Sequence, residues 1–378
     1  MSDLQLLWVV VLIASVIALA WPYLFCPAVL RLLPAKPLAK TGPAPASASL
    51  LFCAFNEADA MPAKIANLRA LKARNPALQI LAYDDGSNDQ TATLLGAASD
   101  VVNLVEGSGR RGKAHGMKQL AALAAGEVLV FTDANVVFGE DAIDRLLDAY
   151  RDPRIGGALG CLRYVHNDGG STAITGSLYW RIEEYLKSLE SRTGSVMGAD
   201  GSIFSVRRAL YPDFPDDVLD DLTVSMAVVF AGRRLVRVAD ALAFEDATTN
   251  RGDERRRKHR IAARSWRTHR YLRPMLARMS ILDRFKYASR KMVRWFGAVF
   301  IVSGAIAAIA LAWSIEPWLA TGGLVVAGSA IAIGFRSRRG PAAALADVLS
   351  GYFATLAGLW QAMRGRNYTT WTPPVSRL

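Results

Sequence analysis

The distribution of apolar residues is the feature that most constrains how this chain can fold. Of the 378 residues 52% are hydrophobic, and the apolar stretches gather at the two ends, from Leu4 to Phe25 and from Trp295 to Met363. A helix needs ~20 apolar residues to cross a hydrocarbon core of ~30 Å. We therefore expect membrane segments on both sides of a middle part that has the composition of a soluble α/β protein.

The N-terminal apolar stretch is either a membrane span or a cleaved signal peptide. A signal peptide carries positive charge before its apolar core, but here Asp3 precedes the core and three basic residues follow it, Arg31, Lys36 and Lys40. This order favours a retained span over residues 1–27, with its N-terminus outside and the following domain in the cytoplasm. Residues 28–47 are rich in Pro, Ala and Lys and predict a linker.

The C-terminal apolar region predicts a transmembrane hairpin over residues 293–335. Three arginines, Arg336, Arg338 and Arg339, follow it and place its end on the cytoplasmic side. The next stretch, 341–363, contains Asp347, so it either crosses the membrane or lies in the interface. A basic tail at 364–378 completes the chain.

The net charge of +12 is compatible with nucleic acid or with anionic lipid head groups as a partner. Lys and Arg gather on the cytoplasmic rim of membrane proteins, so we expect a membrane and no nucleic acid. The three cysteines, Cys26, Cys53 and Cys161, lie far apart and show no zinc or disulfide spacing.

The middle of the chain alternates short apolar runs with stretches of helical period. The runs end at Phe55, Tyr83, Val105 and Phe131 and are short enough to be buried strands. This βαβ repetition predicts an α/β domain at 48–250 with a mostly parallel, Rossmann-like sheet. In such sheets, ligands bind beyond the carboxyl ends of the strands.

Polar clusters follow three of the predicted strands. They are Phe55-Asn56-Glu57, Asp84-Asp85-Gly86-Ser87 with Asp89, and Thr132-Asp133-Ala134-Asn135. One such cluster is explained by turn and cap chemistry. Turn and cap chemistry does not explain three such clusters on successive strand ends, because turns do not require paired carboxylates.

Together with Gly112-Lys113-Ala114 and Asp220-Asp221, these clusters resemble family 2 glycosyltransferases in their order and spacing. The resemblance covers roughly residues 47–270, and the flanking spans are similar to the membrane-bound branch that includes hyaluronan, chitin-oligosaccharide and cellulose synthases. It implies a GT-A fold, an inverting mechanism and a nucleoside-diphosphate sugar donor.

The resemblance assigns several residues to a UDP-sugar donor. Phe55 would stack on or flank the base, and Glu57 and Asp85 would accept hydrogen bonds from the base or ribose. Asp84 would either support that pocket or cap the next helix. Lys113, at the N-terminus of a predicted helix, would contact the pyrophosphate.

The position of the family's DxD motif is held by Asp133 and Asn135. In the family these carboxylates hold Mg²⁺ or Mn²⁺ against the pyrophosphate, where the cation stabilises the departing diphosphate. Asn135 replaces the second acid by a neutral amide. Either the metal then binds more weakly, or Asp133 acts nearly alone.

The resemblance places the acceptor beside the small-residue segment 196–202. Asp200 and Gly201 belong to this segment, and Asp200 either binds an acceptor hydroxyl or forms an Asx turn. Trp180 is either a platform for a sugar or a core aromatic, which is the commoner role.

Residues 251–292 are basic and amphipathic and predict helices on the membrane surface. The related synthases carry a Gln-x-x-Arg-Trp motif here, and the nearest match begins at Arg257 and ends at Ile261. By similarity Arg260 would contact the diphosphate, while most of its basic neighbours would face lipid. The replacements of Gln and Trp speak against processive polymerisation.

Asp220 and Asp221 open a predicted helix over 222–231. Capping and the helix dipole account for one acid at this place. The pair matches the family position at which the second acid is the catalytic base. We therefore expect Asp221 to deprotonate the acceptor and Asp220 to orient it or to cap the helix.

These features predict a multi-pass enzyme of a bacterial-type inner membrane with a cytoplasmic catalytic domain. It would transfer a hexose or N-acetylhexosamine from a UDP-sugar to a saccharide or lipid acceptor, in exopolysaccharide or cell-envelope glycan synthesis, with export or polymerisation proteins as possible partners. Two alternatives stay open. One is glycosylation of a ceramide or polyprenyl lipid, and the other is a scaffold or transport subunit without catalysis.

Overall fold

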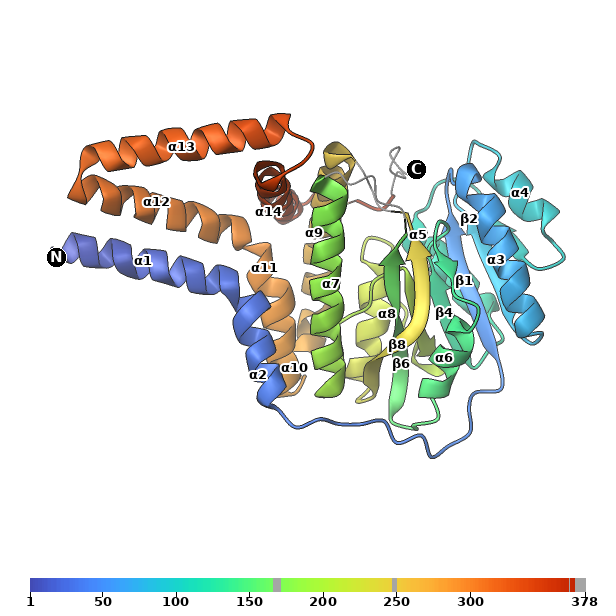
Figure 1. Cartoon of the computed structure of the whole chain (residues 1–378). Coiled ribbons are helices and arrows are strands. Elements are labelled where there is room, and N and C mark those ends of the chain that lie inside the picture. The colour runs from blue at the N-terminus through green and yellow to red at the C-terminus, as the bar shows by residue number, and fades with distance from the viewer. Residues whose placement is uncertain (166–170, 247–249, 367, 371–378) are drawn as a thin grey trace.

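The computed structural model describes residues 1–165, 171–246, 250–366 and 368–370. An α/β domain packs beside a group of long apolar helices formed by both ends of the chain (Figure 1). Within the described residues, eight strands form one sheet in the order β3-β2-β1-β4-β7-β6-β8-β5. Their bounds are β1 (Ala48–Ala54), β2 (Gln79–Asp84), β3 (Asn103–Glu106), β4 (Val128–Thr132), β5 (Val137–Phe138), β6 (Ile155–Tyr164), β7 (Ile203–Arg207) and β8 (Arg234–Glu245).

The sheet is mixed but mostly parallel, as predicted. β1 pairs in parallel with β2 and β4, β2 with β3, and β6 with β8. β7 runs antiparallel to β4 and β6, and β5 runs antiparallel to β8. The carboxyl ends of β1, β2 and β4 therefore meet at one edge, and the polar clusters that follow them are brought together there.

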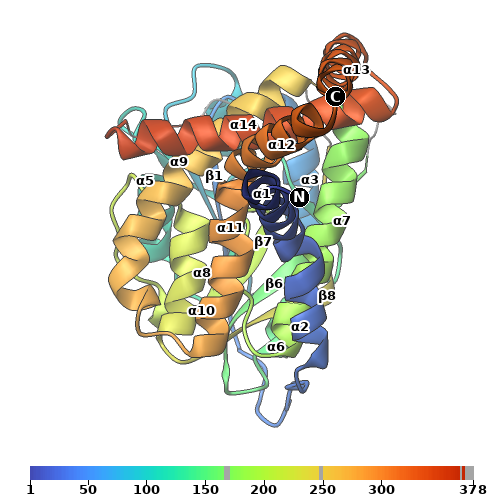
Figure 2. The ribbon, with the colours of Figure 1, turned by 90° about the vertical axis from the view of Figure 1, so that its left-hand side faces the viewer.

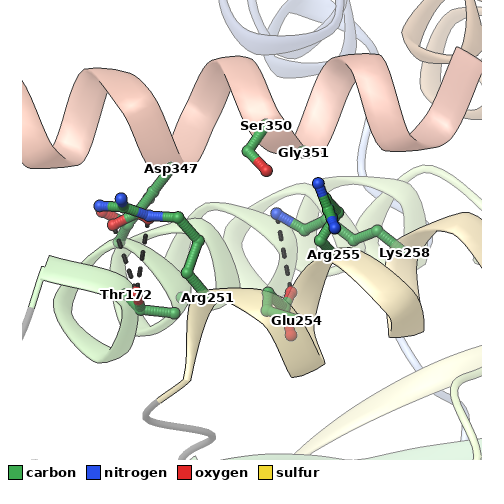
Figure 3. A pocket seen from close by; sticks show the side chains of 10 residues that line it. Thr172, Arg251, Glu254, Arg255, Lys258, Asp347, Ser350 and Gly351 are labelled. Carbon is green, nitrogen blue, oxygen red and sulfur yellow. Dashed lines mark hydrogen bonds and ion pairs between the residues drawn. The ribbon is translucent and has the colours of Figure 1, made fainter. Parts of the chain in front are cut away.

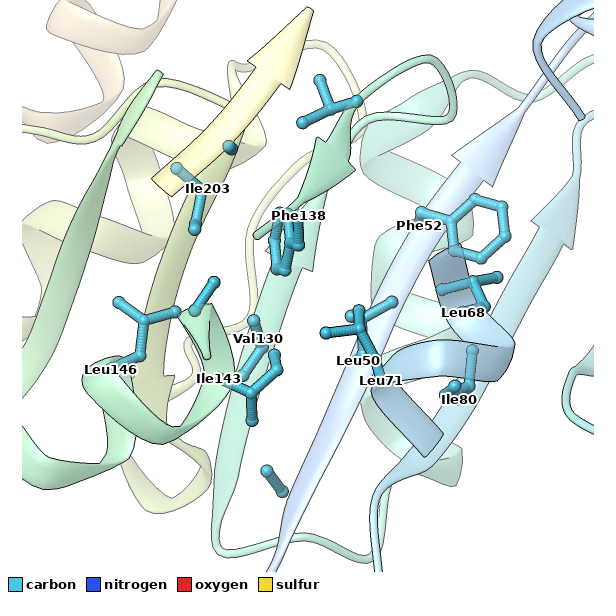
Figure 4. Close-up of a cluster of buried hydrophobic side chains, with 14 of the residues drawn as sticks. Leu50, Phe52, Leu68, Leu71, Ile80, Val130, Phe138, Ile143, Leu146 and Ile203 are labelled. Atoms are coloured by element: carbon cyan, nitrogen blue, oxygen red, sulfur yellow. The ribbon is translucent and has the colours of Figure 1, made fainter. Parts of the chain in front are cut away.

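Helices cover both faces of the sheet. They are α3 (Met61–Arg74), α4 (Thr91–Ala97), α5 (Lys113–Leu123), α6 (Ala142–Ala149), α7 (Ser171–Arg192) and α8 (Asp220–Phe230). Alternate residues of β1 enter different cores: Leu50 and Phe52 pack with α3 and α6, and Leu51 and Cys53 pack on the opposite face (Figure 4). Successive side chains of a strand point to opposite faces of the sheet, and helices cover both faces, so both sets of side chains are buried.

The described part of the chain has four helices long and apolar enough to cross a membrane. The first continues from α1 (Asp3–Ala20) through a π-helical turn at Trp21–Phe25 into α2 (Cys26–Leu32), with a bend between α1 and α2 (Figure 1). Pro22 lies in that turn and accounts for the bend. The predicted linker at 28–47 is therefore wrong at its start, because helix continues to Leu32.

The residues of the predicted hairpin form two helices, α12 (Gly297–Ile315) and α13 (Pro317–Arg336), after the short helix that begins at residue 293. The third C-terminal helix, α14 (Pro341–Met363), does not run beside them. It lies across α1, α12 and α13. These three helices appear lengthwise in Figure 1 and end-on in Figure 2, whereas α14 appears end-on in Figure 1 and lengthwise in Figure 2. This orientation favours the interfacial alternative for residues 341–363. Of the predicted tail at 364–378, residue 367 and residues 371–378 lie outside the described residues.

The basic region forms α9 (Arg251–Leu276), α10 (Ile281–Tyr287), a π-helical turn at Ala288–Met292 and α11 (Val293–Trp295). α9 packs against α14, and small residues permit the close approach. A Cβ on Gly358 would lie 2.2 Å from the carbonyl oxygen of His259. α14 thus covers one face of the helix that the sequence placed directly on the membrane surface.

Asp347, the acid within α14, is paired rather than exposed to lipid. It forms an ion pair with Arg251 at the start of α9 and accepts a hydrogen bond from the hydroxyl of Thr172 on α7 (Figure 3). Lys258 and Arg255 line the same small pocket. An acid in an apolar helix is costly without a partner, so this contact fixes where α14 meets the catalytic domain.

Candidate active site

The loops after β1 and β2 are tied to each other. The backbone N–H of Asn56, whose φ is +51°, donates to Ser87 Oγ at 3.0 Å, and Asn88 N–H donates to Asn56 Oδ1 at 3.0 Å. Asn tolerates this left-handed conformation better than most residues. The sequence-predicted clusters at residues 55–57 and 84–89 therefore form one connected rim.

The two acids after β2 organise the backbone around them. Asp84 accepts hydrogen bonds from the N–H and the hydroxyl of Ser87, at 3.0 and 2.5 Å, and so stabilises the turn. Asp85 is fully buried and accepts from the N–H groups of Arg111 and Gly112 at 2.8 and 2.9 Å. Asp85 thus positions the start of α5, and Asp84 stabilises the turn after β2 without capping α4.

Phe55 is buried, and the Arg110 guanidinium carbon lies 3.6 Å from its ring centroid. The face of the ring that Arg110 covers is therefore occupied by a cation in this structure. Glu57 follows in the same loop, where its backbone N–H donates to Thr91 Oγ1 at 2.9 Å.

Lys113 joins the clusters after β4 and before α8. Its Nζ donates to Asp133 Oδ1 at 2.5 Å and lies 3.8 Å from Asp220 Oδ2. Burial alone would lower the pKa of Lys113, but Asp133, Asp220 and Asp221 outweigh it and raise the pKa. Lys113 is therefore held protonated among three acids from two distant parts of the sequence, Asp133 and the adjacent pair Asp220 and Asp221.

Gly201 closes the space around this pair. A Cβ at Gly201 would lie 2.8 Å from Lys113 Nζ and 3.3 Å from both carboxylate oxygens of Asp133. The absence of a side chain brings the predicted acceptor segment directly against the predicted donor residues.

The acids at the start of α8 differ in their surroundings. The N-cap position is Leu219, with no side-chain cap bond, so Asp220 does not cap the helix in the usual way. Burial and the charge of Asp220 raise the pKa of Asp221 to about 6, against a smaller opposing effect of Lys113. A carboxylate with this pKa is suited to accept a proton near neutral pH.

The second position of the DxD-like motif points to β8. Asn135 Nδ2 donates to Glu245 Oε1 at 2.9 Å. Arg257 on α9 interacts electrostatically with Glu254, Tyr164, Glu245 and Asp133, which together outweigh burial and raise its pKa.

Arg257 was missed as a site residue, because most neighbours of Arg260 were expected to face lipid. It occupies the position of Gln in the Gln-x-x-Arg-Trp motif, which was the available signal. Arg260 lies one turn further along the partly buried face of α9.

The predicted acceptor residues also cluster. Asp200 Oδ2 accepts from Lys187 Nζ at 2.5 Å, and the Asp200 Oδ1 accepts from Ser202 N–H in an Asx turn. Lys187 Nζ lies 4.6 Å from the ring centroid of Trp180. The buried indole N–H of Trp180 has no hydrogen-bond partner among the described residues, and its ring packs against the main hydrophobic core.

Lys64 on α3 holds the loop that carries Asp133. Its buried Nζ donates to Thr132 Oγ1, to the carbonyl of Asp133 and to the carbonyl of Val136, at 3.3, 3.1 and 2.6 Å. Burial lowers its pKa to about 7. No pattern in the sequence signals this role, because Lys64 resembles any helical lysine until α3 and β4 are packed together.

A divalent cation with oxygen ligands fits beside Asp133. The described residues contain no group of three or more His, Cys, Asp or Glu side chains placed to hold a metal. Mg²⁺, however, commonly takes one or two carboxylates and completes its shell with phosphate oxygens and water. The carboxylate of Asp133, with Asn135 two residues on, therefore suits a cation bound together with a diphosphate.

The sequence profile of glycosyl transferase family 2 matches residues 49–214. An N-acetylglucosaminyltransferase of Rhizobium leguminosarum bv. viciae is 25% identical over 232 residues, which cover 56% of this chain and 53% of that protein. An N-acetylglucosaminyltransferase of Rhizobium meliloti (strain 1021) is 25% identical over 189 residues, 44% of this chain and 43% of that protein. The chain thus spans about half the length of these relatives.

Among solved structures, mannosyltransferase PcManGT from Pyrobaculum calidifontis in complex with GDP-Man and Mn²⁺ is similar with a TM-score of 0.74. The match covers 96% of this chain and 99% of that chain at 20% sequence identity, so it concerns the fold, including the helices at both ends. The profile match shows that residues 49–214 are similar to glycosyl transferase family 2, and the likeness to the solved structure shows a GT-A fold.

Proposed function

We propose that the chain is an inverting glycosyltransferase that moves an N-acetylhexosamine or hexose from a UDP-sugar to a saccharide or lipid acceptor at the membrane. One observation carries this proposal, namely that Lys113, Asp133 and the Asp220–Asp221 pair converge beside Gly201. The relatives named as N-acetylglucosaminyltransferases make UDP-N-acetylglucosamine the first donor to test.

The charges of the site suit a diphosphate leaving group. Lys113 and Arg257 supply positive charge near Asp133. Asp133, with Asn135, would hold a divalent cation, which when bound neutralises the departing diphosphate as a Lewis acid. Phe55, Glu57 and Asp85 form or support the rim on which we place the base and ribose, and Arg260 remains a further candidate for the diphosphate.

The acceptor side of the site is built around Asp221. In the proposed reaction Asp221 takes the proton of the attacking hydroxyl, and its neighbour Asp220 stays near Lys113 and keeps the pKa of Asp221 raised. Asp200, Gly201 and Trp180 line the approach. The alignment of the hydroxyl with Asp221 and the donor carbon provides the rate advantage of a fixed geometry.

The test is donor turnover by protein purified in detergent. UDP release should be measured with UDP-N-acetylglucosamine, UDP-N-acetylgalactosamine, UDP-glucose and UDP-galactose, with Asp221→Asn as the matched control. The proposal is supported if the parent protein releases UDP from one of these donors and Asp221→Asn does not. UDP binding without turnover of any donor would favour the scaffold alternative.

A further inference from the structure

Three basic residues lie where the interface helices pack against α7. Arg290 forms ion pairs with Glu183, at 3.0 Å, and with Glu190, and Arg294 forms an ion pair with Glu183. Lys291 lies between them in the π-helical turn at Ala288–Met292. It forms no hydrogen bond or ion pair with any described residue, although two glutamates are close enough to bind its neighbours.

The side chain of Lys291 points toward the acceptor side of the candidate active site. Its Nζ lies 3.8 Å from the position that a Cβ on Gly198 would take, and Gly198 has a φ of +95°. Asp221 and Lys291 interact electrostatically, but Asp221 is not within ion-pair distance. The ammonium thus lies on the same side of the candidate active site as the proposed base.

An ammonium in such surroundings is costly unless something pairs with it. Burial and the charge of Arg290 lower the pKa of Lys291 to about 8, which leaves it mostly protonated at neutral pH. Asp221 is an incomplete partner, because it loses its charge when it takes a proton from the acceptor. An anionic group on the ligand would satisfy Lys291 throughout the reaction.

The position of Lys291 relative to the membrane indicates the source of that anion. It precedes Gly297, the first residue of α12, by six residues. The turn that carries Lys291 is joined to α12 through α11, which lies at the end where α12 begins and runs across the direction of α12 (Figure 1). Lipid phosphates lie at the level where a membrane span begins, just outside the hydrocarbon core.

We propose that Lys291 binds the phosphate of a lipid that carries the acceptor, and so places the acceptor hydroxyl at Asp221. The inference rests on the proposed function for the transfer step but concerns a binding site that can be measured without turnover. It commits the acceptor to a lipid-linked phosphate rather than a neutral glycolipid or a free saccharide.

The experiment measures binding of geranyl phosphate to the full chain in a neutral detergent, with geraniol and glucuronate as matched ligands. Lys291→Met should weaken geranyl phosphate binding by about tenfold or more, the loss expected for a hydrogen bond to a charged group. Lys291→Arg should restore most of it. Arg284→Met removes a charge from an exposed residue of α10 and should leave the affinity unchanged.

Several results would overturn the inference. The first two are an unchanged affinity of Lys291→Met for geranyl phosphate and a loss of that affinity in Arg284→Met as large as in Lys291→Met. The other two concern the matched ligands: Lys291→Met loses as much affinity for geraniol as for geranyl phosphate, or Lys291 is needed to bind glucuronate and not geranyl phosphate. UDP binding in the same variants reports whether the fold is intact. If Lys291 binds the phosphate but no donor is turned over, the proposed function fails and this site stands.

Discussion

Two adjacent acids at the start of α8 show how surroundings assign different roles to identical side chains. Asp220 is 6% exposed and lies 3.8 Å from the cationic Lys113, whereas Asp221 is partly exposed and accepts a hydrogen bond from the backbone N–H of Leu222 at 2.6 Å. The pKa of Asp221 is raised to about 6 by burial and by Asp220. Asp221 is therefore the one placed to exchange a proton.

Asp221→Asn should cut sugar transfer by at least about a hundredfold, the usual contribution of general base catalysis, while UDP affinity stays nearly unchanged. In the parent protein, turnover should rise as the pH passes about 6, because only the ionised carboxylate accepts a proton. The measurement is kcat against pH for both proteins. A near-parental rate in Asp221→Asn with a large loss in Asp220→Asn would reverse the roles.

The raised pKa of Asp221 also predicts a stability effect. A carboxyl whose pKa is higher folded than unfolded binds its proton more tightly when folded, so the free energy of unfolding falls as the pH rises from about 4 to about 6. Asp221→Asn removes this cost and should raise the melting temperature at pH 7. The gain in melting temperature of Asp221→Asn over the parent should be larger at pH 7 than at pH 4. If the gain is the same at both pH values, Asp221 is not held in an unfavourable ionised state.

Asp133 provides the test for a metal. Asp133→Ala should abolish turnover. Excess EDTA should inactivate the parent protein, and added Mg²⁺ or Mn²⁺ should restore its activity. Asn135→Asp should keep activity and bind the cation more tightly, because it adds a charge beside Asp133. Full activity in excess EDTA would contradict the metal site.

Gly201 tests whether the donor and acceptor parts meet where the structure places them. In Gly201→Ala the new Cβ would lie 2.8 Å from Lys113 Nζ, which is mobile enough to move, so the fold should persist. Displacing the Lys113–Asp133 pair should lower kcat/KM by about tenfold to a hundredfold. Gly96→Ala, on α4 with no atom within 4 Å of the new Cβ, is the control and should behave like the parent.

At the scale of elements, the contact between α9 and α14 connects the catalytic domain to the membrane part. Ala346, Gly351, Ala354 and Gly358 give α14 a buried face of small residues. This face lets α9 approach to backbone distance, and the Arg251–Asp347 ion pair fixes the position of α14 along it. Arg257 lies on α9, so the packing of α14 against α9 contributes to its position.

Gly358→Ala should separate α9 from α14, because the new Cβ would lie 2.2 Å from the backbone carbonyl oxygen of His259. Backbone cannot move aside as a flexible side chain does, so we expect a loss of about 1–3 kcal/mol in the free energy of unfolding. Thermal unfolding in detergent measures it. Gly328→Ala on α13, where the Cβ would meet no atom within 4 Å, should be neutral or stabilising, and equal effects of the two variants would contradict this packing.

At the scale of the whole molecule, both ends of the chain contribute helices to one membrane part. α1 packs along α12, and the hydroxyls of Ser15 and Ser303 lie 2.9 Å apart between them. The basic residues Arg31, Lys36 and Lys40 follow the first span, so we propose that the N-terminus lies outside and the catalytic domain in the cytoplasm.

Single cysteines at Ser2 and Ser47 test this arrangement. In intact cells an impermeant maleimide should label the first and spare the second, and both should react after the cells are opened. The natural cysteines, Cys26, Cys53 and Cys161, are buried and should give little background. Equal labelling of the two positions in intact cells would contradict the topology.

The sequence determined the features that depend on neighbours along the chain. The lengths and apolar content of the ends predicted the N-terminal span and the hairpin, and the short apolar runs predicted the C-terminal ends of β1, β2, β3 and β4 to within one residue. The carboxyl ends of parallel strands share one edge of the sheet, so the sequence predicted that the clusters around Glu57, Asp85 and Asp133 lie close together.

The tertiary structure decided everything that depends on which distant elements pack together. Arg257, Lys64 and Lys291 are ordinary basic residues in the sequence, and their positions follow from how α9, α3 and the interface helices meet the sheet and α8. The orientation of α14 depends on a small-residue face whose partner lies about a hundred residues earlier in the chain. Local period and composition do not encode such pairings, because burial and electrostatic partners exist only after the elements are assembled.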